Sequence, residues 1–140
     1  MKNKGKILAI DFGYHFVGLA VSDDARLMAF GKGVIRGYKS LNGLFEKLRS
    51  FCSDEVVTRI VMGLPLGEGS AETTKTERVR SIGKKLEDFV GIPVDFVDES
   101  FSSFEAGSRL MERGVKEHRV KEHEDEVAAV LILERYLAQK

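Results

Sequence analysis

Three acidic residues at the ends of apolar segments are the residues of this chain best suited to chemistry. Asp11 and Glu99 each follow an apolar run, and Asp125 opens another. A carboxylate in such a position must be hydrated, hydrogen-bonded or bound to a cation, because burying its bare charge is very costly. If the three side chains meet, their oxygen atoms would suit a hard divalent cation such as magnesium.

Two observations favour their meeting. Asp11 and Glu99 lie at the ends of predicted strands, and ligands of open α/β sheets gather at the carboxyl ends of strands. On a helix that turns 100 degrees per residue, Asp125 shares one stripe with Ala128 and Ala129. Because alanines allow a helix to approach a sheet closely, we expect Asp125 to point toward the sheet.

Each carboxylate also has a simpler explanation. Asp11 could form a turn at the end of its strand, and Glu99 could be solvated in a loop. Asp125 could be an acid in the first turn of a helix, where the helix dipole stabilises it by about 0.3–1 kcal/mol. Asp98 also competes with Glu99, because neighbours in a strand point to opposite faces and periodicity does not decide which residue faces the site. The candidate site therefore depends on the combination of the three residues.

The composition indicates one globular domain. A length of 140 residues is typical of a single domain, and 43% apolar with 31% charged residues is a typical balance. Because 22 Lys and Arg equal 22 Asp and Glu, a nucleic-acid partner would have to bind local basic patches. The lone Cys52 excludes an intramolecular disulfide and a cysteine-based zinc site, and we expect it to be a small core or surface thiol.

A cytoplasmic location is expected by default. No apolar run approaches the roughly 20 residues that are needed to cross a membrane. The N-terminus is basic, but the apolar run after it reaches Asp11 too soon for a signal peptide.

The hydrophobic pattern predicts strands first and then helices that alternate with strands. Predicted strands at 6–12 and 17–22 are joined by a connection short enough to force an antiparallel hairpin. Gly31 and Gly33 weaken a third strand and suggest a bulge or an edge position. That strand runs from Leu27 to Val34 or Arg36, and the other predicted elements are a helix at 40–52 capped by Ser40, a strand at 59–64, a polar loop around 67–70, a helix ending near Val90, a strand at 92–97, a helix from Ser102 or Ser103 to Met111 or Glu112, a charged loop at 116–124 and a helix starting near Asp125.

This order predicts an α/β domain that spans residues 1–140, with a mixed five-stranded sheet flanked by helices. Three antiparallel, hairpin-linked strands are followed by two parallel strands, which is the order of the ribonuclease H-like fold. The same order occurs in each half of the actin-like ATPases. A nucleotide-binding enzyme of that class is disfavoured, because it closes two domains over ATP and the chain contains no second Asp-x-Gly hairpin.

Four motifs, in order and at full-length spacing, resemble the YqgF family, also called RuvX, of bacterial Holliday junction resolvases and pre-16S ribosomal RNA nucleases. Residues 11–13 are similar to the family's opening Asp-x-Gly, and residues 63–65 to its Gly-Leu-Pro signature. Residues 98–99 resemble its Asp-Glu-Arg segment, and residues 125–129 its Asp-x-x-Ala-Ala helix start. The resemblance implies the ribonuclease H-like fold.

The resemblance also implies an acidic site at Asp11, Glu99 and Asp125, and it selects Glu99 over Asp98. It implies a metal-dependent endonuclease that hydrolyses phosphodiester bonds. Two Mg²⁺ or Mn²⁺ ions near 4 Å apart would activate a water and stabilise the leaving 3′ oxygen. Asp11 would bridge both ions, and the other two carboxylates would each complete one side.

Two places depart from the family pattern. His15 and Phe16 stand where the family has a Lys-Arg pair in the first hairpin turn, and Ser100 stands where an Arg follows Asp-Glu. Both changes remove cations that would hold phosphates near the metal ions. A catalytically weak nucleic-acid- or protein-binding module of the same fold is therefore an alternative.

Basic residues elsewhere are candidates for holding a nucleic-acid substrate, although the acids interleaved with them also fit a solvated face. The candidates are His15, Arg78, Arg109, Arg113, Lys116, Arg119 and Lys121, and Lys75, Arg80, Lys84 and Lys85 extend the group around Arg78 on the predicted long helix.

The substrate is open between pre-16S RNA, for maturation of its 5′ end, and a Holliday junction. A junction resolvase is expected to act as a two-fold dimer that cuts two strands symmetrically. No heptad or long apolar surface stripe predicts a dimer, which favours RNA processing slightly. Both a monomer and a homodimer are compatible with the sequence.

Overall fold

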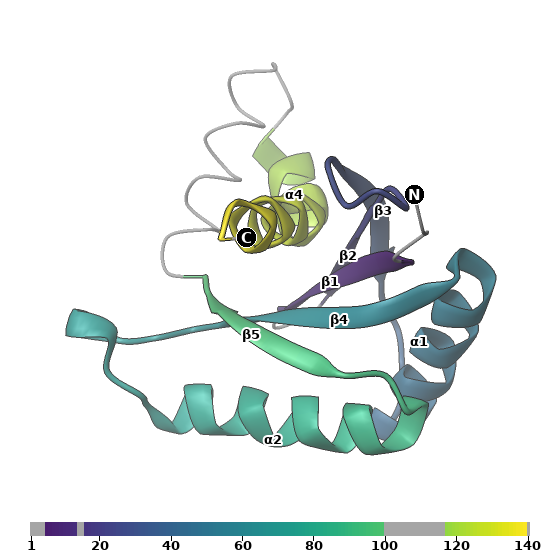
Figure 1. The fold of residues 1–140 in the computed structure, drawn as a ribbon. Helices are drawn as coiled ribbons and strands as arrows, with labels where there is room; N and C mark the ends of the chain where they lie inside the picture. The colour runs from purple at the N-terminus through teal and green to yellow at the C-terminus, as the bar shows by residue number, and fades with distance from the viewer. Residues whose placement is uncertain (1–4, 14–15, 100–116, 140) are drawn as a thin grey trace.

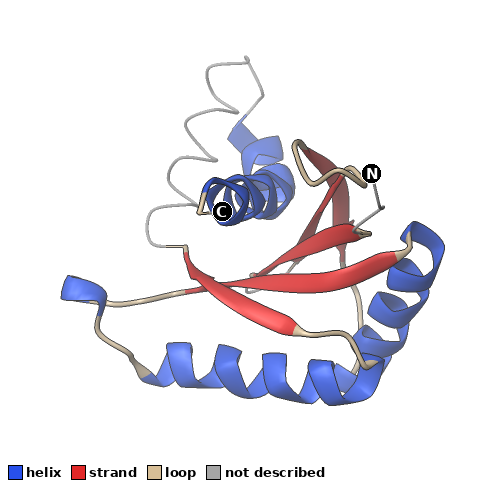
Figure 2. Cartoon of the chain, viewed as in Figure 1, coloured by secondary structure: helices blue, strands red, loops and turns tan. Residues whose placement is uncertain are grey.

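One five-stranded sheet organises the part of the chain that the computed structural model describes, residues 5–13, 16–99 and 117–139, with the side chains of residues 117–122 excepted. Its elements are β1 (Lys6–Phe12), β2 (Val17–Ser22), β3 (Ala29–Ile35), α1 (Leu41–Glu55), β4 (Val57–Leu64), a short 3-10 helix (Glu68–Ser70), α2 (Thr74–Val90), β5 (Val94–Asp98) and α4 (Glu117–Ala138). The helices α1 and α2 cover one face of the sheet, and α4 covers the other (Figure 1, Figure 2).

The strand directions confirm the predicted mixed sheet. The strands lie in the order β3-β2-β1-β4-β5. β1, β2 and β3 are antiparallel neighbours, whereas β4 runs parallel to β1 and β5 runs parallel to β4. β3 is an edge strand, as its glycines suggested, and its register with β2 shifts between Gly18 and Ala20. Since β1, β4 and β5 share one direction, their carboxyl ends lie at the same edge of the sheet.

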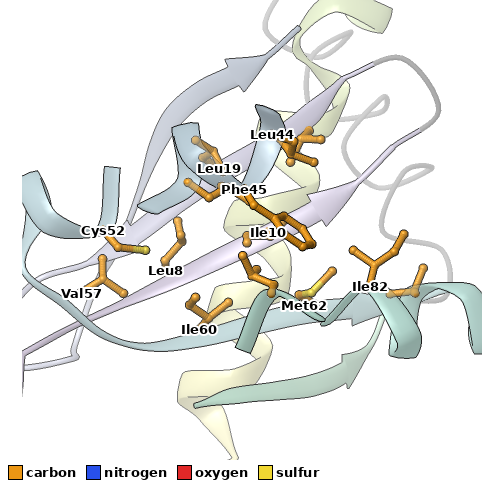
Figure 3. Packing of buried hydrophobic residues seen from close by; sticks show 14 of the residues in the cluster. Leu8, Ile10, Leu19, Leu44, Phe45, Cys52, Val57, Ile60, Met62 and Ile82 are labelled. Atoms are coloured by element: carbon orange, nitrogen blue, oxygen red, sulfur yellow. The ribbon is translucent and has the colours of Figure 1, made fainter. Parts of the chain in front are cut away.

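Alternate side chains of the central strand β1 enter two separate apolar layers. Leu8 and Ile10 belong to the larger cluster, which packs against α1 and α2 (Figure 3). Ile7 and Ala9 belong to a second cluster with residues of α4. Each of these four side chains is at most 1% exposed. Asp11 continues the series of Ile7 and Ala9, so its side chain faces α4.

Cys52 is a core residue of α1 rather than a surface thiol. It is buried in the larger cluster, where Figure 3 shows it near Val57. Burial raises the pKa of its thiol to about 11. The thiol therefore stays protonated at neutral pH and is a weak nucleophile.

The predicted start of α1 is confirmed. The Ser40 hydroxyl accepts a hydrogen bond from the backbone N–H of Gly43 at 3.0 Å, which satisfies a donor at the helix N-terminus. The helix continues to Glu55, three residues past its predicted end, and Val56 then adopts the left-handed conformation with φ of 60°. β4 accordingly begins at Val57, two residues earlier than predicted.

The predicted charged loop at residues 116–124 is wrong. α4 begins at Glu117 and runs to Ala138, so Asp125 lies two turns inside the helix instead of at its start. The residues between Glu117 and Glu124 include no Gly or Pro and are rich in Glu, Lys and Arg, which have good helix propensity. High charge in this segment therefore marks a polar helix.

Two further predictions about the elements have different outcomes. β5 begins at Val94 rather than at Ile92, because Pro93 has no N–H to donate and contributes only its carbonyl, which accepts from Ile60 at 2.9 Å. The helix predicted after Ser102 or Ser103 lies outside the described residues. Within the described ranges, no helix is both long and apolar enough to pass through a membrane.

Gly18 allows α4 to lie directly on β2. A Cβ atom at this position would be 1.8 Å from the carbonyl oxygen of Asp125 and 2.8 Å from the backbone nitrogen of Glu126. Both are backbone atoms of α4, so relieving the clash would require moving the helix. The Glu126 carboxylate also accepts a hydrogen bond from the backbone N–H of Gly33 in β3. These contacts fix the position of the part of α4 that contains Asp125.

Gly18→Ala is expected to lower the free energy of unfolding by at least about 2 kcal/mol, in the upper part of the range for overpacking. The physical reason is that the added methyl group meets helix backbone, which cannot rotate away. Urea unfolding followed by circular dichroism measures the change.

Gly43→Ala is the matched control for this substitution. A Cβ at Gly43 would meet only the Ser40 hydroxyl, at 3.3 Å. Because alanine is the better helix former, the control is expected to be neutral or more stable by up to about 1 kcal/mol. A Gly18→Ala variant as stable as the wild type would contradict the close approach of α4.

Candidate active site

Asp11 is a buried acid at the carboxyl end of the central strand. Its residue is 3% exposed. Burial raises the pKa of Asp11 well above its usual range, and Glu99 and then Asp125 raise it further through hydrogen bonds and charge repulsion. A hydrogen bond between two carboxyl groups requires a proton on one of them. The structure therefore brings all three predicted acids together, with Asp11 in contact with both others.

Glu99 reaches Asp11 because the pairing of β5 with β4 continues past the end of β5. The backbone N–H of Glu99 donates to the carbonyl of Leu64 at 3.1 Å. Its side chain lies over Gly63, where a Cβ atom would be only 2.8 Å from Glu99 Oε2. Gly63 of β4 thus leaves room for the carboxylate.

The choice between Asp98 and Glu99 follows from the face that α4 covers. Val97 is buried in the cluster on the α4 side, whereas Asp98 is exposed. The backbone carbonyl of Asp98 accepts a hydrogen bond from Arg135 Nη1 at 2.9 Å. Glu99, the residue selected by the family resemblance, is the one that contacts Asp11.

Asp125 approaches Asp11 from α4. A Cβ atom on Gly13 would lie 2.5 and 2.6 Å from the two carboxylate oxygens of Asp125, so these oxygens lie against the backbone that follows β1. The predicted orientation of the Asp125 stripe is confirmed, because Ala128 and Ala129 are fully buried. The helix-dipole explanation of Asp125 is wrong, since the dipole acts only within the first turn.

These carboxyl groups form a compact acidic cluster (Asp11, Glu99 and Asp125) rather than a ready-made set of metal ligands. Among the residues that the structure describes, no group of three or more His, Cys, Asp or Glu side chains has the arrangement of a metal site. Direct carboxyl–carboxyl contact is expected when shared protons screen the charges. The donor set fits a hard divalent cation, because it offers carboxylate oxygens and because a cation would replace those protons.

Most of the predicted basic residues lie outside the part of the chain whose side chains the structure describes. His15, Arg109, Arg113 and Lys116 are not among the described residues, and of Arg119 and Lys121 only the backbone, within α4, is described. Arg78 is described, and it is exposed on α2. It lines a hollow of about 420 Å³ that also includes Phe12, Gly13 and Lys75. Arg78 is thus close to the end of β1 but on the face of the sheet opposite α4.

Two residues near the site were not identified from the sequence. The guanidinium of Arg36 lies over the ring of Phe16, 5.5 Å from its centroid, and so carries a cation to the first hairpin. Tyr38 lines the hollow beside Arg78. The pairing of Val17 with Ile35 places Arg36 next to Phe16. A predicted β2–β3 register was therefore the signal that could have identified Arg36.

Comparison with known proteins agrees with the motifs. A family model described as RuvX, Holliday junction resolvase, matches residues 5–139. The chain belongs to the RuvX family. A relative from Dictyoglomus thermophilum named "Putative pre-16S rRNA nuclease" is 38% identical over 132 residues, which cover 94% of each chain. A relative of the same name from Maridesulfovibrio salexigens is 38% identical over 134 residues, covering 96% of this RuvX-family chain and 98% of its own.

Solved structures of RuvC share the fold. The structure "T. thermophilus RuvC in complex with Holliday junction substrate" aligns with a TM-score of 0.57 at 17% identity, over 96% of this chain and 94% of that one. A second Thermus thermophilus RuvC structure aligns with a TM-score of 0.55 at 16% identity. At such identities the likeness concerns the fold alone, and it confirms the predicted ribonuclease H-like fold.

Asp11→Asn is expected to stabilise this RuvX-family protein when divalent cations are absent. Because the pKa of Asp11 is raised in the folded state, the folded chain retains a proton that the unfolded chain has already released. Stability contributed at this position is therefore lost as the pH rises from the ordinary carboxylic range through the raised pKa. Asn carries no such charge, so the Tm advantage of the variant in EDTA should grow with pH, by about 2–5 °C for each kcal/mol.

Asp24→Asn is the control, because Asp24 is exposed in the turn before β3. Its Tm should follow the wild-type pH profile. Parallel pH profiles of Tm for Asp11→Asn and the wild type would contradict the raised pKa of Asp11.

Proposed function

We propose that this RuvX-family protein is a metal-dependent endonuclease that hydrolyses phosphodiester bonds, with Asp11, Glu99 and Asp125 as its catalytic residues. The observation that carries the proposal is the buried Asp11 carboxyl in contact with two further carboxyl groups. Such an arrangement costs stability, and it has a chemical use when a divalent cation occupies it. The family membership and the names of the relatives support nuclease chemistry independently.

Each of the three residues would contribute carboxylate oxygens to bound Mg²⁺ or Mn²⁺. Asp11 contacts both of the other acids, which suits it to a position shared between two ions, whereas Glu99 and Asp125 approach from β5 and from α4. When bound, two such ions supply an activated water and stabilise the charge on the leaving oxygen. The backbone of each acid is anchored, since Asp11 lies in β1, Asp125 lies in α4 and the N–H of Glu99 is bonded to Leu64 directly after β5.

Basic side chains near the cluster would hold the substrate phosphates. Arg36 places a guanidinium at the first hairpin, close to where the family pattern has Lys-Arg and this chain has His15 and Phe16. Arg78 is exposed on the other side of the β1 end. Arg36 would thus compensate in part for the missing cations, which favours an active enzyme over a binding module. His15, Arg109, Arg113, Lys116, Arg119 and Lys121 remain predicted contacts.

The proposed substrate is the precursor of 16S ribosomal RNA, cut during maturation of its 5′ end. Relatives at 38% identity over nearly the whole chain are named for this activity. The second candidate is a Holliday junction, favoured by the family description and by the RuvC fold. The proposed partner is in either case a nucleic acid.

A cleavage assay separates these possibilities. Labelled precursor 16S RNA, a four-way DNA junction and a linear DNA duplex are incubated with the wild type and Mn²⁺. We expect cutting of the RNA at its 5′ leader, and a loss of at least about 100-fold in Asp11→Asn, since even supporting residues of metal sites contribute 10–100-fold. Asp24→Asn should cut like the wild type.

Cutting confined to the four-way junction would move the function to junction resolution. Binding of both substrates without cutting of either would contradict the nuclease proposal and favour a binding module.

Metal binding can be measured without activity. Mn²⁺ is expected to raise the Tm of the wild type, because a ligand of the folded state at 100 times its Kd stabilises by about 2.7 kcal/mol. Glu99→Gln and Asp125→Asn should each reduce this rise, and Asp24→Asn should retain it. An equal rise in all variants would place the Mn²⁺ elsewhere on the molecule.

A further inference from the structure

We propose that a groove between the start of α1 and the side of α2 binds a single-stranded segment of nucleic acid next to the phosphate that is cut, with an unpaired base against Tyr38. The position next to a cleaved phosphate rests on the proposed nuclease function. The groove itself is defined by residues outside the acidic cluster.

The groove consists of two adjoining hollows of about 420 and 480 Å³. Phe12, Tyr38, Arg78 and Ile82 line both hollows, so the two are continuous. The remaining lining residues are Gly13, Lys75 and Val79 in the first hollow and Lys39, Ser40, Leu41, Ser81 and Lys85 in the second.

The floor of the groove is apolar and aromatic. Val79 and Ile82 are buried in the larger core cluster, and Phe12 and Tyr38 are partly buried against it. Both rings therefore have fixed positions and retain surface that faces the groove. A fixed aromatic ring with an open side is a platform for stacking a nucleobase, an interaction that every base can make.

The rim of the groove is basic. Lys39, Lys75, Arg78 and Lys85 are exposed, and none of them forms an ion pair with a carboxylate of the described residues. The described part of the lining contains no acidic residue. The helix α1 begins at the groove, at Leu41, and its N-terminus adds partial positive charge. Polyanionic ligands match this rim.

By contrast, nearby basic residues of α2 outside the groove form ion pairs with acidic side chains. Arg80 pairs with Glu72 at 2.7 Å, and Lys84 pairs with Glu87 and Asp88 at 3.6 Å. Lys75, Arg78 and Lys85 recur at intervals of three and seven residues, which places them on one side of the helix. Unpaired cations are thus concentrated on the side of α2 that lines the groove.

The groove leads to the acidic cluster through Gly13. This residue lines the first hollow, and a Cβ atom on it would lie 2.5 Å from Asp125 Oδ2. Phe12 and Asp11 are neighbours in β1 and point to opposite faces of the sheet. A strand in the groove would therefore pass around the end of β1 at Gly13 to bring its phosphate to the cluster.

This geometry favours a single strand over a duplex. Bases of a duplex are stacked on one another and present only their edges and the backbone, whereas an unpaired base can place its face on a ring. Phe12 and Tyr38 are partly buried whereas the cations of the rim are exposed, so a base would contact the rings while its phosphates stay with the cations.

Binding to a single-stranded RNA and to a duplex of the same sequence is measured by fluorescence anisotropy in EDTA, where no cutting occurs. The variant Arg78→Gln with Lys85→Gln is compared with the matched control Lys47→Gln with Lys84→Gln, whose positions are on α1 and α2 but outside the groove. We expect the groove variant to bind the single strand at least about tenfold more weakly, with a salt slope less steep by about 1.4, since single strands lose about 0.7 per cationic contact. The control should bind like the wild type, and circular dichroism should be unchanged in both.

Tyr38→Leu tests the base. It should weaken binding of the single strand by about 5- to 100-fold, the scale of one stacked base, whereas Tyr38→Phe should retain it. In a series of oligonucleotides that each carry one abasic nucleotide at a different position, at least one should bind the wild type more weakly than the intact strand does, and should bind Tyr38→Leu as tightly as the intact strand does.

The proposal is overturned if the groove variant and its control bind alike, if the duplex binds as tightly as the single strand, or if polyglutamate displaces the RNA at lower concentration than RNA itself, which would indicate an acidic protein partner. The binding assay keeps its meaning even if no substrate is cut. Cutting by the wild type with unchanged binding in the groove variant would contradict this inference and leave the nuclease function intact.

Discussion

The buried carboxyl of Asp11, held against Glu99 and Asp125, is the interaction on which the rest of this structure depends. Burial and two acidic neighbours all disfavour its ionised form, so the cluster carries either shared protons or a bound cation. A fold that keeps three acids in this relation loses stability at neutral pH while no cation is bound, and the proposed divalent cation would offset that loss. The raised pKa and the proposed metal binding are therefore two consequences of the same contact.

Glycines and parallel strand pairing in the surrounding fold determine where the acids of the cluster lie. Parallel pairing of β4 with β5 continues through the Glu99 N–H to Leu64, which fixes one acid at the strand ends. Gly18 and Gly13 make room for the backbone and the carboxylate of Asp125, and so α4 fixes another. The opposite face of the sheet holds the larger core (Figure 3). The groove beside α2 lies on this face too. Gly13 is common to both faces, which connects the acidic cluster to the proposed strand-binding groove.

Local sequence patterns predicted much of this arrangement, whereas features that depend on packing between distant segments could not be predicted from the sequence. The apolar runs that end at Asp11 and before Glu99 identified the strands, and the two alanines of the last helix predicted the orientation of Asp125. Periodicity could not choose Glu99 over Asp98, because the choice depends on which face α4 covers. The start of α4 was misplaced because its first two turns are charged and carry no apolar stripe. Tyr38 could not be identified from the sequence, because the residues that line the groove with it come from β1 and α2, which are distant in the chain.

The most direct test of the proposed metal site is a crystal structure with Mn²⁺, in which anomalous scattering locates the metal. We expect manganese at the acidic cluster, with oxygen atoms of Asp11, Glu99 and Asp125 as ligands, and two peaks about 4 Å apart when a nucleic acid is bound. Manganese bound elsewhere, with the Asp11 carboxyl still in direct contact with its two acidic neighbours, would contradict a metal site at the cluster.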